Sequence, residues 1–292
     1  MRILILGANG ILGHILFLLL NKNNNNILVQ GICGKSVSSN NFYLENNQKL
    51  KIVDLTDVNV LTKIIDEFKP DFVINCTVKK NEPNIQNDYI ENIFINSLLP
   101  HIITNLSEKY NFKFIHISTD SVLGSNFKLA NEKSQYKAND FYSATKLIGE
   151  VVSSNNAITI RTSIIGHSLS GNSGLIDWIL SKNKLLGYSK CFYSGTTALE
   201  LSKQILKIIQ NPHFNNGLYH IGAKKISKYM LLKKISIIYN LKNTIEKDNN
   251  ITINRILDTT KFNNIYNYNS PNWNQLLLET KDFHQKNINI YA

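Results

Sequence analysis

The chain has 292 residues, enough for one large domain or two modest ones with a substantial core, and 43% of them are hydrophobic. The net charge of +11 comes from dispersed lysines with no long cationic run, so we expect no nucleic-acid partner. No apolar stretch is long enough to span a bilayer, no signal peptide is recognisable, and the three cysteines lack metal-ligand spacing. We therefore expect a cytoplasmic protein with reduced thiols, no membrane contact and no bound metal.

The head of the chain indicates a dinucleotide site. A continuous apolar run of strand length ends at Gly7, and a helical pattern follows over Ile11–Leu20. In this context Gly7 allows a tight turn, Gly10 lets the backbone approach a pyrophosphate, and Gly13 permits close packing of helix and strand. The amino terminus of the helix then faces the phosphates with its positive end.

The residues at the end of the second strand, which we expect over Ile27–Cys33, favour NADP(H) over NAD(H) as the cofactor. In NAD-binding sites an acidic residue about twenty positions after the glycine motif binds the ribose hydroxyls. Here that position falls in Cys33-Gly34-Lys35-Ser36, which contains no carboxylate. Lys35 and Ser36 suit a 2′-phosphate, so NADP(H) is the preferred cofactor and NAD(H) the alternative.

The rest of the first half continues to alternate strand and helix, which predicts a doubly wound parallel sheet of Rossmann type. The last of these strands delivers Ser118-Thr119-Asp120 at its carboxyl end, where ligands bind in such sheets. The expected strands are Lys51–Val53, Phe72–Cys76 and Phe112–Ile117, and the expected helices are Val58–Phe68, with Asp57 as its cap, and Tyr89–Tyr110.

A candidate acid–base pair lies further along the chain. Tyr142 and Lys146 are four residues apart, so they share one face of a helix. An ammonium beside a phenol favours the phenolate, which would let Tyr142 exchange a proton near neutral pH. A hydroxyl at the end of the preceding strand, such as that of Thr119, can hold the substrate oxygen. The pair alone is weak evidence, and the glycine motif is what gives it weight.

Together these motifs resemble the extended branch of the short-chain dehydrogenase/reductase superfamily. Three strings, Ser-Thr-Asp-Ser-Val-Leu from 118, Phe-Tyr-Ser-Ala-Thr-Lys-Leu-Ile-Gly-Glu from 141 and Ile-Arg-Thr-Ser-Ile-Ile-Gly from 160, resemble the dTDP-4-dehydrorhamnose reductase group of nucleotide-sugar 4-ketoreductases. Weaker likeness extends to 193–197, to 217–221 and to Pro271-x-Trp273. The resemblance implies NADP(H)-dependent reduction of a 4-keto-(6-deoxy) nucleotide sugar in surface-polysaccharide or deoxysugar biosynthesis.

The resemblance also implies roles for individual residues. Thr119 would hold the C4 oxygen, Tyr142 would protonate it, and Lys146 would bind the cofactor ribose and lower the pKa of Tyr142. The expected cofactor-binding residues are Gly7, Asn9, Gly10, Ile11, Leu12, Gly13, Lys35, Ser36, Asp54, Leu55, Cys76, Thr77, Val78, Asn96, Ser118, Tyr142 and Lys146. The expected substrate-binding residues are Lys79, Thr119, Asp120, Ser121, Arg161, Tyr193 and Arg255.

From about Ser163 the pattern changes. We expect a Rossmann domain over 1–165 and a smaller α/β substrate lobe over 166–292, some of which packs back on the Rossmann sheet. The expected helices are Gly174–Ser181, Thr197–Gln210 and Ser227–Tyr239, with a strand over Leu218–Ile221 and a polar loop over Asn263–Asn269. The loop Lys182–Tyr188 and Arg255 are candidates for the diphosphate, and Trp178 or Tyr193 for the sugar or base.

Related activities remain as alternatives. A 4,6-dehydratase needs an Asp-Glu pair directly after the Thr, and Ser121 stands where the Glu would be. Some epimerases use a Cys and a His as their acid–base pair, and the sequence around Cys191, His167 and His220 does not resemble the motif of those enzymes. The 4-epimerases, which retain Thr, Tyr and Lys, are the nearest alternative, and a non-catalytic nucleotide-binding regulatory subunit is the other. The expected partner is a nucleotide-diphosphate sugar, and a homodimer stays open.

Overall fold

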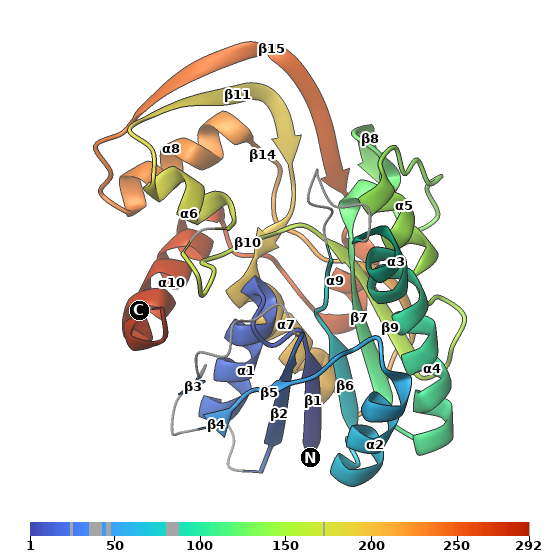
Figure 1. Cartoon of the computed structure of the whole chain (residues 1–292). Helices are drawn as coiled ribbons and strands as arrows, with labels where there is room; N and C mark the ends of the chain where they lie inside the picture. Colours follow the sequence, from blue (N-terminus) through green and yellow to red (C-terminus); the bar gives the residue numbers. More distant parts are fainter. Residues whose placement is uncertain (24–25, 35–42, 45–47, 80–87, 172, 292) are drawn as a thin grey trace.

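The computed structural model of the protein describes residues 1–23, 26–34, 43–44, 48–79, 88–171 and 173–291. Within these residues lies a seven-stranded parallel sheet in the order β13-β9-β7-β6-β1-β2-β5 (Figure 1). This order, which runs outward from β1 in both directions, is doubly wound, so the predicted fold class is confirmed. The strands are β1 (Arg2–Leu6), β2 (Leu28–Cys33), β5 (Lys51–Ile52), β6 (Phe72–Asn75), β7 (Lys113–Thr119), β9 (Ala157–Thr162) and β13 (Gly217–His220).

Helices cover both faces of this sheet because its strands are apolar on both faces. Side chains alternate along β1: Ile3 and Ile5 enter the core beneath α1 and α7, and Leu4 and Leu6 enter the core beneath α2 and α4. On the second face, α3 and α5 pack on the π-helical turn η1. The bounds are α1 (Ile11–Asn23), α2 (Val58–Phe68), α3 (Asp88–Ile93), η1 (Phe94–Leu98), α4 (Leu99–Tyr110), α5 (Phe141–Ile148) and α7 (Ala198–Gln210).

Local sequence explains where two of these helices begin. Asp57 caps α2, as expected, because its carboxylate accepts hydrogen bonds from the backbone N–H groups of Asn59 and Val60. The single helix predicted over Tyr89–Tyr110 is divided into α3, η1 and α4. Pro100 lies in the first turn of α4, where a missing N–H removes no helical hydrogen bond. The π-helical turn before it carries Asn96.

A second, smaller sheet stands above the carboxyl ends of the large one (Figure 1), in the order β14-β11-β15-β8. Its long strands β11 and β15 run parallel and arch over the molecule, with α6 and α8 contributing to the core beneath them. The predicted loop Lys182–Tyr188 is therefore mostly strand. The bounds are β8 (Asn126–Ala130), α6 (Leu175–Leu180), β11 (Lys184–Tyr193), β14 (Ile226–Ser227), α8 (Lys228–Ile238) and β15 (Thr244–Leu257).

Short elements complete the described chain. They are β3 (Tyr43–Leu44), β4 (Gln48–Lys49), the 3₁₀ turn η2 (Asp120–Leu123), β10 (Ile164–Ile165), β12 (Thr196–Thr197), α9 (Thr260–Tyr266), α10 (Trp273–Lys286) and the 3₁₀ turn η3 (Ile288–Ile290). The two sheets exchange segments: β8 comes from the first half of the sequence, whereas α7 and β13, from the second half, belong to the layers of the large sheet. The two predicted domains, 1–165 and 166–292, are defined by sequence alone, so the boundary between them stays a prediction.

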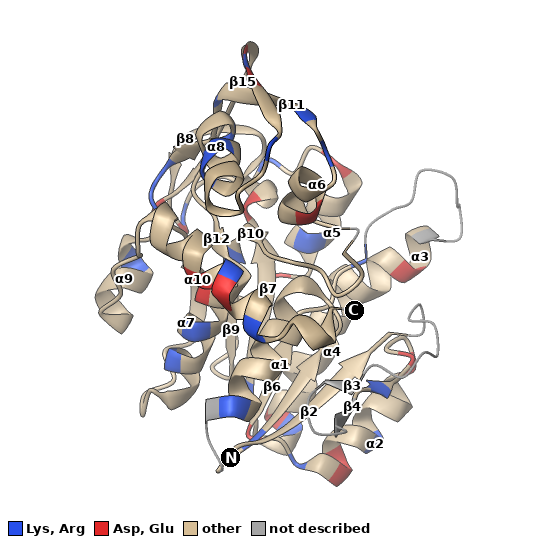
Figure 2. Ribbon diagram, turned by 90° about the vertical axis from the view of Figure 1, so that its left-hand side faces the viewer, with Lys and Arg blue, Asp and Glu red and all other residues tan. Residues whose placement is uncertain are grey.

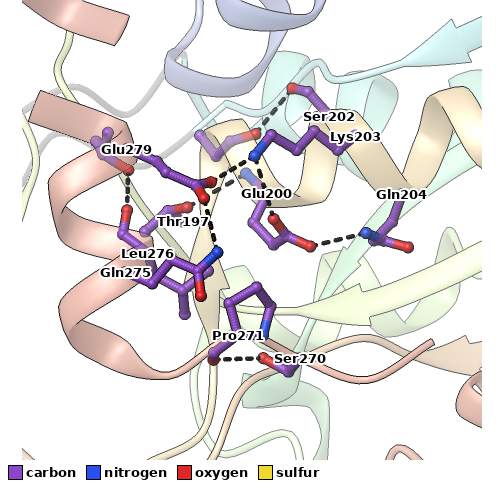
Figure 3. Close-up of polar contacts among 12 residues, drawn as sticks. Thr197, Glu200, Ser202, Lys203, Gln204, Ser270, Pro271, Gln275, Leu276 and Glu279 are labelled. Atoms are coloured by element: carbon purple, nitrogen blue, oxygen red, sulfur yellow. Dashed lines mark hydrogen bonds and ion pairs between the residues drawn. The ribbon is translucent and has the colours of Figure 1, made fainter. Parts of the chain in front are cut away.

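The carboxyl-terminal helix is fastened to the helix layer of the large sheet. Lys203 of α7 donates a hydrogen bond to Glu279 of α10, and Gln275 donates to the other oxygen of the same carboxylate at 3.0 Å (Figure 3). Glu200, one turn before Lys203, accepts from Gln204 at 2.7 Å. The indole of Trp273, at the start of α10, donates to the carbonyl of Lys224 at 2.6 Å. These contacts hold α10 beside both α7 and the loop before β14.

Basic residues are spread over the molecule. In Figure 2, Lys and Arg colour short segments of α7, α9, β8 and β11 and do not follow one continuous stripe. In the described part of the chain, no helix combines the length and apolar character that crossing a membrane requires. The same residues contain no grouping of three or more His, Cys, Asp or Glu side chains that could hold a metal ion.

Candidate functional site

A cavity of about 480 Å³ opens at the carboxyl ends of the parallel strands. It lies where β1 pairs with β2 on one side and β6 on the other, the point at which the winding of the sheet reverses. Doubly wound sheets bind ligands at this point. The lining residues are Gly7, Asn9, Gly10, Gly34, Asp54, Leu55, Thr56, Cys76, Thr77, Val78, Lys79, Glu91 and Ile95.

The glycine turn forms a backbone cradle in this lining. Gly7 has a φ of +79°, and a Cβ on it would lie 2.9 Å from the carbonyl carbon of Cys76. A Cβ on Gly13 would lie 2.1 Å from the carbonyl oxygen of Gly7, so the first turn of α1 packs directly on the glycine turn. Bare backbone at the amino terminus of a helix fits the pyrophosphate of a dinucleotide.

Most of the predicted cofactor-binding residues of the first strands meet at this cavity, and three do not. Ile11 packs near Gly166, Leu12 is buried in the core, and Gly13 packs against the back of the glycine turn. Asp54 lines the cavity, and its carboxylate accepts hydrogen bonds from the N–H and hydroxyl of Thr56. Lys35 and Ser36, on which the preference for NADP(H) rests, lie outside the described residues.

Asn96 organises the loop after β6. Its side-chain oxygen accepts from the backbone N–H of Lys79 at 3.1 Å, and its NH₂ donates to the carbonyl of Lys79 and to the hydroxyl of Thr145. Asn96 itself is fully buried. It thereby joins the cavity wall to α5. Lys79, predicted to bind substrate, lines the same cavity as the predicted cofactor residues and forms an ion pair with Glu91 at 2.9 Å.

Thr119 and Tyr142 meet at the carboxyl end of β7, the strand next to β6, and neither is among the residues that line the cavity. Thr119 closes β7, and Tyr142 is the second residue of α5, which Asp140 starts with a capping box. The Thr119 hydroxyl lies 3.0 Å from that of Ser121 and is a hydrogen-bond partner of the Tyr142 phenol. Burial raises the pKa of Tyr142 to about 12, against the opposing effect of that hydrogen bond. The phenol is therefore protonated at neutral pH.

Lys146 lies one turn further along α5 and is 2% exposed. Its Nζ donates to the carbonyl of Ile117 at 2.7 Å, and burial lowers the pKa of Lys146 to about 8, with Glu150 and Cys76 opposing the change. Lys146 is not among the charged groups that shift the pKa of Tyr142. Burial of the phenol is the largest cause of the rise in its pKa, and a lowering of this pKa by Lys146 stays a prediction.

Asp120 lies next to Thr119 and is influenced by two cations. Burial raises the pKa of Asp120 to about 6, and Arg255 on β15 and Lys228 on α8 act against this rise. The Nζ of Lys228 lies 4.8 Å from the ring centroid of Tyr193, whose hydroxyl donates to the carbonyl of Ser163. Lys228 was not predicted from the sequence, where it is simply the residue after a helix cap. The pairing of β11 with β14 is what brings it to Tyr193.

Two predicted site residues, Arg161 and Ser118, form hydrogen bonds with the carboxylate of Glu150. Arg161 is fully buried, and its guanidinium donates to both oxygens of Glu150 at 2.7 and 2.8 Å. The hydroxyl of Ser118 donates to the same carboxylate at 2.7 Å. Removal of one partner of a buried ion pair of this kind would lower the free energy of unfolding by roughly 3–5 kcal/mol. The structure therefore gives Arg161 a structural place between β9 and the end of α5, not a place on the cavity wall.

The Cys and His residues of the second half do not form an acid–base pair. The Cys191 thiol donates to the carbonyl of Ile251, His167 contacts the hydroxyl of Tyr239, and His220 contacts Arg161. Burial raises the pKa of the Cys191 thiol. Trp178, another candidate for the sugar or base, is 42% exposed on α6.

Comparison with known proteins gives one family. A family model described as "RmlD substrate binding domain" matches residues 1–281. Curated relatives include a spore coat polysaccharide biosynthesis protein SpsK of Bacillus subtilis, 22% identical over 61% of this chain and 64% of that protein. A dTDP-4-dehydrorhamnose reductase of Aggregatibacter actinomycetemcomitans is 25% identical over 82% and 87%. A methionine adenosyltransferase 2 subunit beta of Xenopus laevis is 23% identical over 82% and 72%.

Solved structures agree on the fold. A dTDP-4-dehydrorhamnose reductase from Clostridium acetobutylicum superimposes with a TM-score of 0.78 at 20% identity, covering 98% of this chain and all of that one. A dTDP-4-dehydrorhamnose reductase from Bacillus anthracis in complex with NADP gives a TM-score of 0.76 at 18% identity, covering 96% and 98%. At these identities the likeness carries the fold, and the chemistry rests on the residues themselves.

Proposed function

The chain belongs to the family described as RmlD substrate binding domain, and on that basis we propose that it is an NADP(H)-dependent reductase of a 4-keto-(6-deoxy) nucleotide sugar. The observation that carries the proposal is the meeting of Thr119 and Tyr142 at the end of β7, with Lys146 one turn away and near Cys76 of the cavity wall. The amine thus lies near the wall of a cavity with a glycine cradle, and the hydroxyl and the phenol meet at the end of the neighbouring strand β7.

Thr119, Tyr142 and Lys146 each have a separate role in the proposed reduction. A nicotinamide cofactor, when bound at the glycine turn, would supply hydride to the C4 carbon. The Thr119 hydroxyl holds the C4 oxygen, and Tyr142 donates its proton to that oxygen as the carbonyl becomes an alcohol. A phenol that stays protonated at neutral pH is suited to this direction, because an alkoxide is a stronger base than a phenolate even with the pKa of Tyr142 at about 12. Lys146 holds the ribose of the cofactor.

The cofactor and the substrate are proposed to approach from two sides. Gly7, Gly10 and the start of α1 receive the pyrophosphate of the cofactor, and the cavity that they line supports this. Arg255 and Lys228, beside Asp120, offer positive charge to the diphosphate of the sugar nucleotide. NADP(H) is the preferred cofactor because residues 33–36, at the end of β2, contain no carboxylate. A relative crystallised with NADP supports that choice.

The setting of the reaction is part of the same proposal. Polysaccharide or deoxysugar biosynthesis is supported by the name of the Bacillus subtilis relative, which is a spore coat polysaccharide biosynthesis protein. We place the reaction in the cytoplasm, where nucleotide sugars and reduced thiols are found together. The three cysteines of the chain are free. A homodimer remains a prediction.

Replacement of Tyr142 by Phe tests the proposed proton donor. We expect Tyr142→Phe to lower the rate of NADPH-dependent reduction by at least ~10²-fold, the usual scale of a general-acid contribution, with cofactor binding kept. Tyr110→Phe removes a hydroxyl from a half-buried tyrosine at the far end of α4 and should leave the rate unchanged. Undiminished turnover in Tyr142→Phe would remove the phenol from the mechanism.

The two alternatives give different results in the same assay. A 4-epimerase converts its sugar nucleotide without net consumption of NADPH. A regulatory subunit, suggested by the likeness to a methionine adenosyltransferase subunit, binds the nucleotide and turns over nothing, so Tyr142→Phe would have no phenotype. Net oxidation of NADPH that depends on Tyr142 is expected of the reductase alone.

A further inference from the structure

A series of buried polar side chains leads from the cavity to Lys146. Thr77, on the cavity wall, donates from its backbone N–H to Oδ1 of Asn75 at 3.0 Å. Nδ2 of Asn75 lies 3.3 Å from Nδ1 of His116, its register partner on β7. Nε2 of His116 lies 3.5 Å from Nζ of Lys146. Asn75 and His116 are both fully buried, so water does not compete for these contacts.

The backbone N–H of Thr77 determines where the hydrogens of this series lie. It can only donate, so the Asn75 atom facing it is the carbonyl oxygen, and the atom facing His116 is the NH₂. That NH₂ donates to Nδ1 of His116, which must then be unprotonated. Burial lowers the pKa of His116 well below its usual value, so the ring is neutral and carries its one proton on Nε2. This N–H faces Lys146.

An N–H in this position disfavours the ammonium form of Lys146. If Lys146 is charged, both partners are donors and neither accepts. If it is neutral, its lone pair accepts from Nε2 of His116 while its own N–H still donates to the carbonyl of Ile117. The other titratable groups around Lys146 are Tyr142 one turn earlier on α5, Glu150 beyond the end of α5 and Cys76 just after β6, and His101 of α4 acts on His116.

Two other buried histidines carry their proton on the opposite nitrogen. Nδ1 of His14 lies 2.7 Å from the carbonyl oxygen of Gly10, and Nδ1 of His220 lies 3.1 Å from that of Ala130. A carbonyl oxygen only accepts, so both rings are protonated on Nδ1. His116 therefore differs from them in a way that one spectrum can show.

We infer that Asn75 and His116 are positioning residues for Lys146: Asn75 holds His116 as the Nε2–H tautomer, and His116 directs that N–H at the amine and makes the lysine proton labile. The role in reduction rests on the proposed function, whereas the arrangement of hydrogens does not. The lowered pKa of Lys146, about 8 with burial as its largest cause, is consistent with this arrangement.

The tautomer is measured first, on the wild-type protein without added substrate or cofactor. Long-range ¹H–¹⁵N NMR of histidine-labelled protein distinguishes a protonated ring nitrogen from a bare one. We expect His116 to be protonated on Nε2, with His14 and His220 protonated on Nδ1 as references in the same spectrum. The His116 signal is assigned in the wild-type protein itself, from correlations that link its ring to its own backbone resonances. A His116 ring protonated on Nδ1 would overturn the inference.

The titration of Lys146 is measured second, from the ¹³Cε shift of labelled lysine, assigned with Lys146→Met. In His116→Gln the new amide can turn its carbonyl oxygen to Nζ, so the ammonium gains an acceptor. The titration midpoint should then rise by about one pH unit. His213→Gln, the same change at an exposed position, should leave it unchanged. A midpoint that stays or falls in His116→Gln counts against the inference, and if this variant does not fold the tautomer measurement decides.

Activity separates this inference from the proposed function. If the reaction needs Lys146 charged, the rate falls as the pH rises through its titration, and in His116→Gln this fall moves to higher pH. A basic limb that does not move contradicts the role of His116 and leaves the reductase intact. A wild-type protein without reductase activity contradicts the proposed function, and both NMR measurements still decide the role of His116.

Discussion

Lys228 and Arg255 give the candidate substrate site a positive charge that no single element provides. Arg255 lies on β15, and its Nε is buried without a hydrogen-bond partner in the described part of the chain. Lys228 opens α8, with its Nζ over the ring of Tyr193. Asp120 compensates one of the two charges at most, and one positive charge remains beside Thr119. A diphosphate is the substrate group that such a site suits.

Removal of one of these cations should weaken substrate binding more than chemistry. We expect Lys228→Met to raise the KM for the sugar nucleotide by about tenfold with little change in kcat, because a charge-assisted contact of ~1.4 kcal/mol is lost from the bound state. Steady-state kinetics over a range of substrate concentrations measure this. Lys225→Met is the control, since Lys225 is exposed and its Nζ lies over the ring of Phe192. An unchanged KM in Lys228→Met would place the diphosphate elsewhere.

Residues on local motifs were predictable from the sequence, and residues placed by tertiary contacts were not. The glycine turn follows from spacing within one strand–turn–helix unit, and the pairing of Tyr142 with Lys146 follows from spacing within one helix. Lys228 reaches the site only through the pairing of β11 with β14. Arg161 was predicted to bind substrate, but Glu150, eleven residues earlier in the chain, accepts hydrogen bonds from its Nε and Nη2.

At the scale of elements, the start of α1 is joined to the carboxyl terminus of the chain. His14, one turn into α1, donates from Nδ1 to the carbonyl of Gly10, and its Nε2 accepts from the hydroxyl of Tyr291 at 2.8 Å. The rings of His167 and His284 stack at 3.7 Å beside them, and Asp177 lies 3.5 Å from His167. The glycine turn and α10 are thus held through one cluster of histidines, in which His14 and His167 are buried and His284 is half-buried.

This cluster should make the fold sensitive to acid. Burial lowers the pKa of His14 to about 4, below its value of 6.5 in an unfolded chain, so its contribution to stability is complete above pH 6.5 and is lost as the pH falls towards 4. At pH 5 the unfolding free energy should be about 2 kcal/mol lower than at pH 7.5 from His14 alone.

Denaturant unfolding at the two pH values tests this expectation. In His14→Asn the amide can still donate to the carbonyl of Gly10, and the loss of stability at pH 5 should be smaller than in the wild type. His213→Asn, an exposed change, should keep the wild-type pH dependence. Equal pH dependence in His14→Asn and the wild type would contradict a neutral buried His14.

Elements of the large sheet were predicted well and those of the small sheet poorly. Buried parallel strands are continuous apolar runs bounded by turns, and such runs are visible in β1, β6 and β7. β15 is polar over most of its length and has only two buried residues, so its sequence carries little strand signal, and it was not predicted. The polar segment 263–269 was predicted as a loop, yet α9 extends over Thr260–Tyr266 because Phe262 and Tyr266 bury their rings in the core.

At the scale of the whole molecule, the site lies where the two sheets face one another. The large sheet and its helices carry the cavity, Thr119 and Tyr142, and the small sheet together with α8 carries Arg255, Tyr193 and Lys228. The chain crosses between the two sheets at β8, β9, β11, β13 and β14, so neither half of the sequence makes the site alone. The resemblance to the extended short-chain reductases that the motifs indicated is confirmed by the family match.

The most direct test of the central claim is consumption of NADPH by the wild-type protein with a panel of 4-keto-6-deoxy sugar nucleotides, with NADH run beside it. We predict oxidation of NADPH with one member of the panel, slower oxidation of NADH, and a reduced sugar nucleotide in equal amount. Tight binding of NADPH with no oxidation across the panel would contradict the reductase.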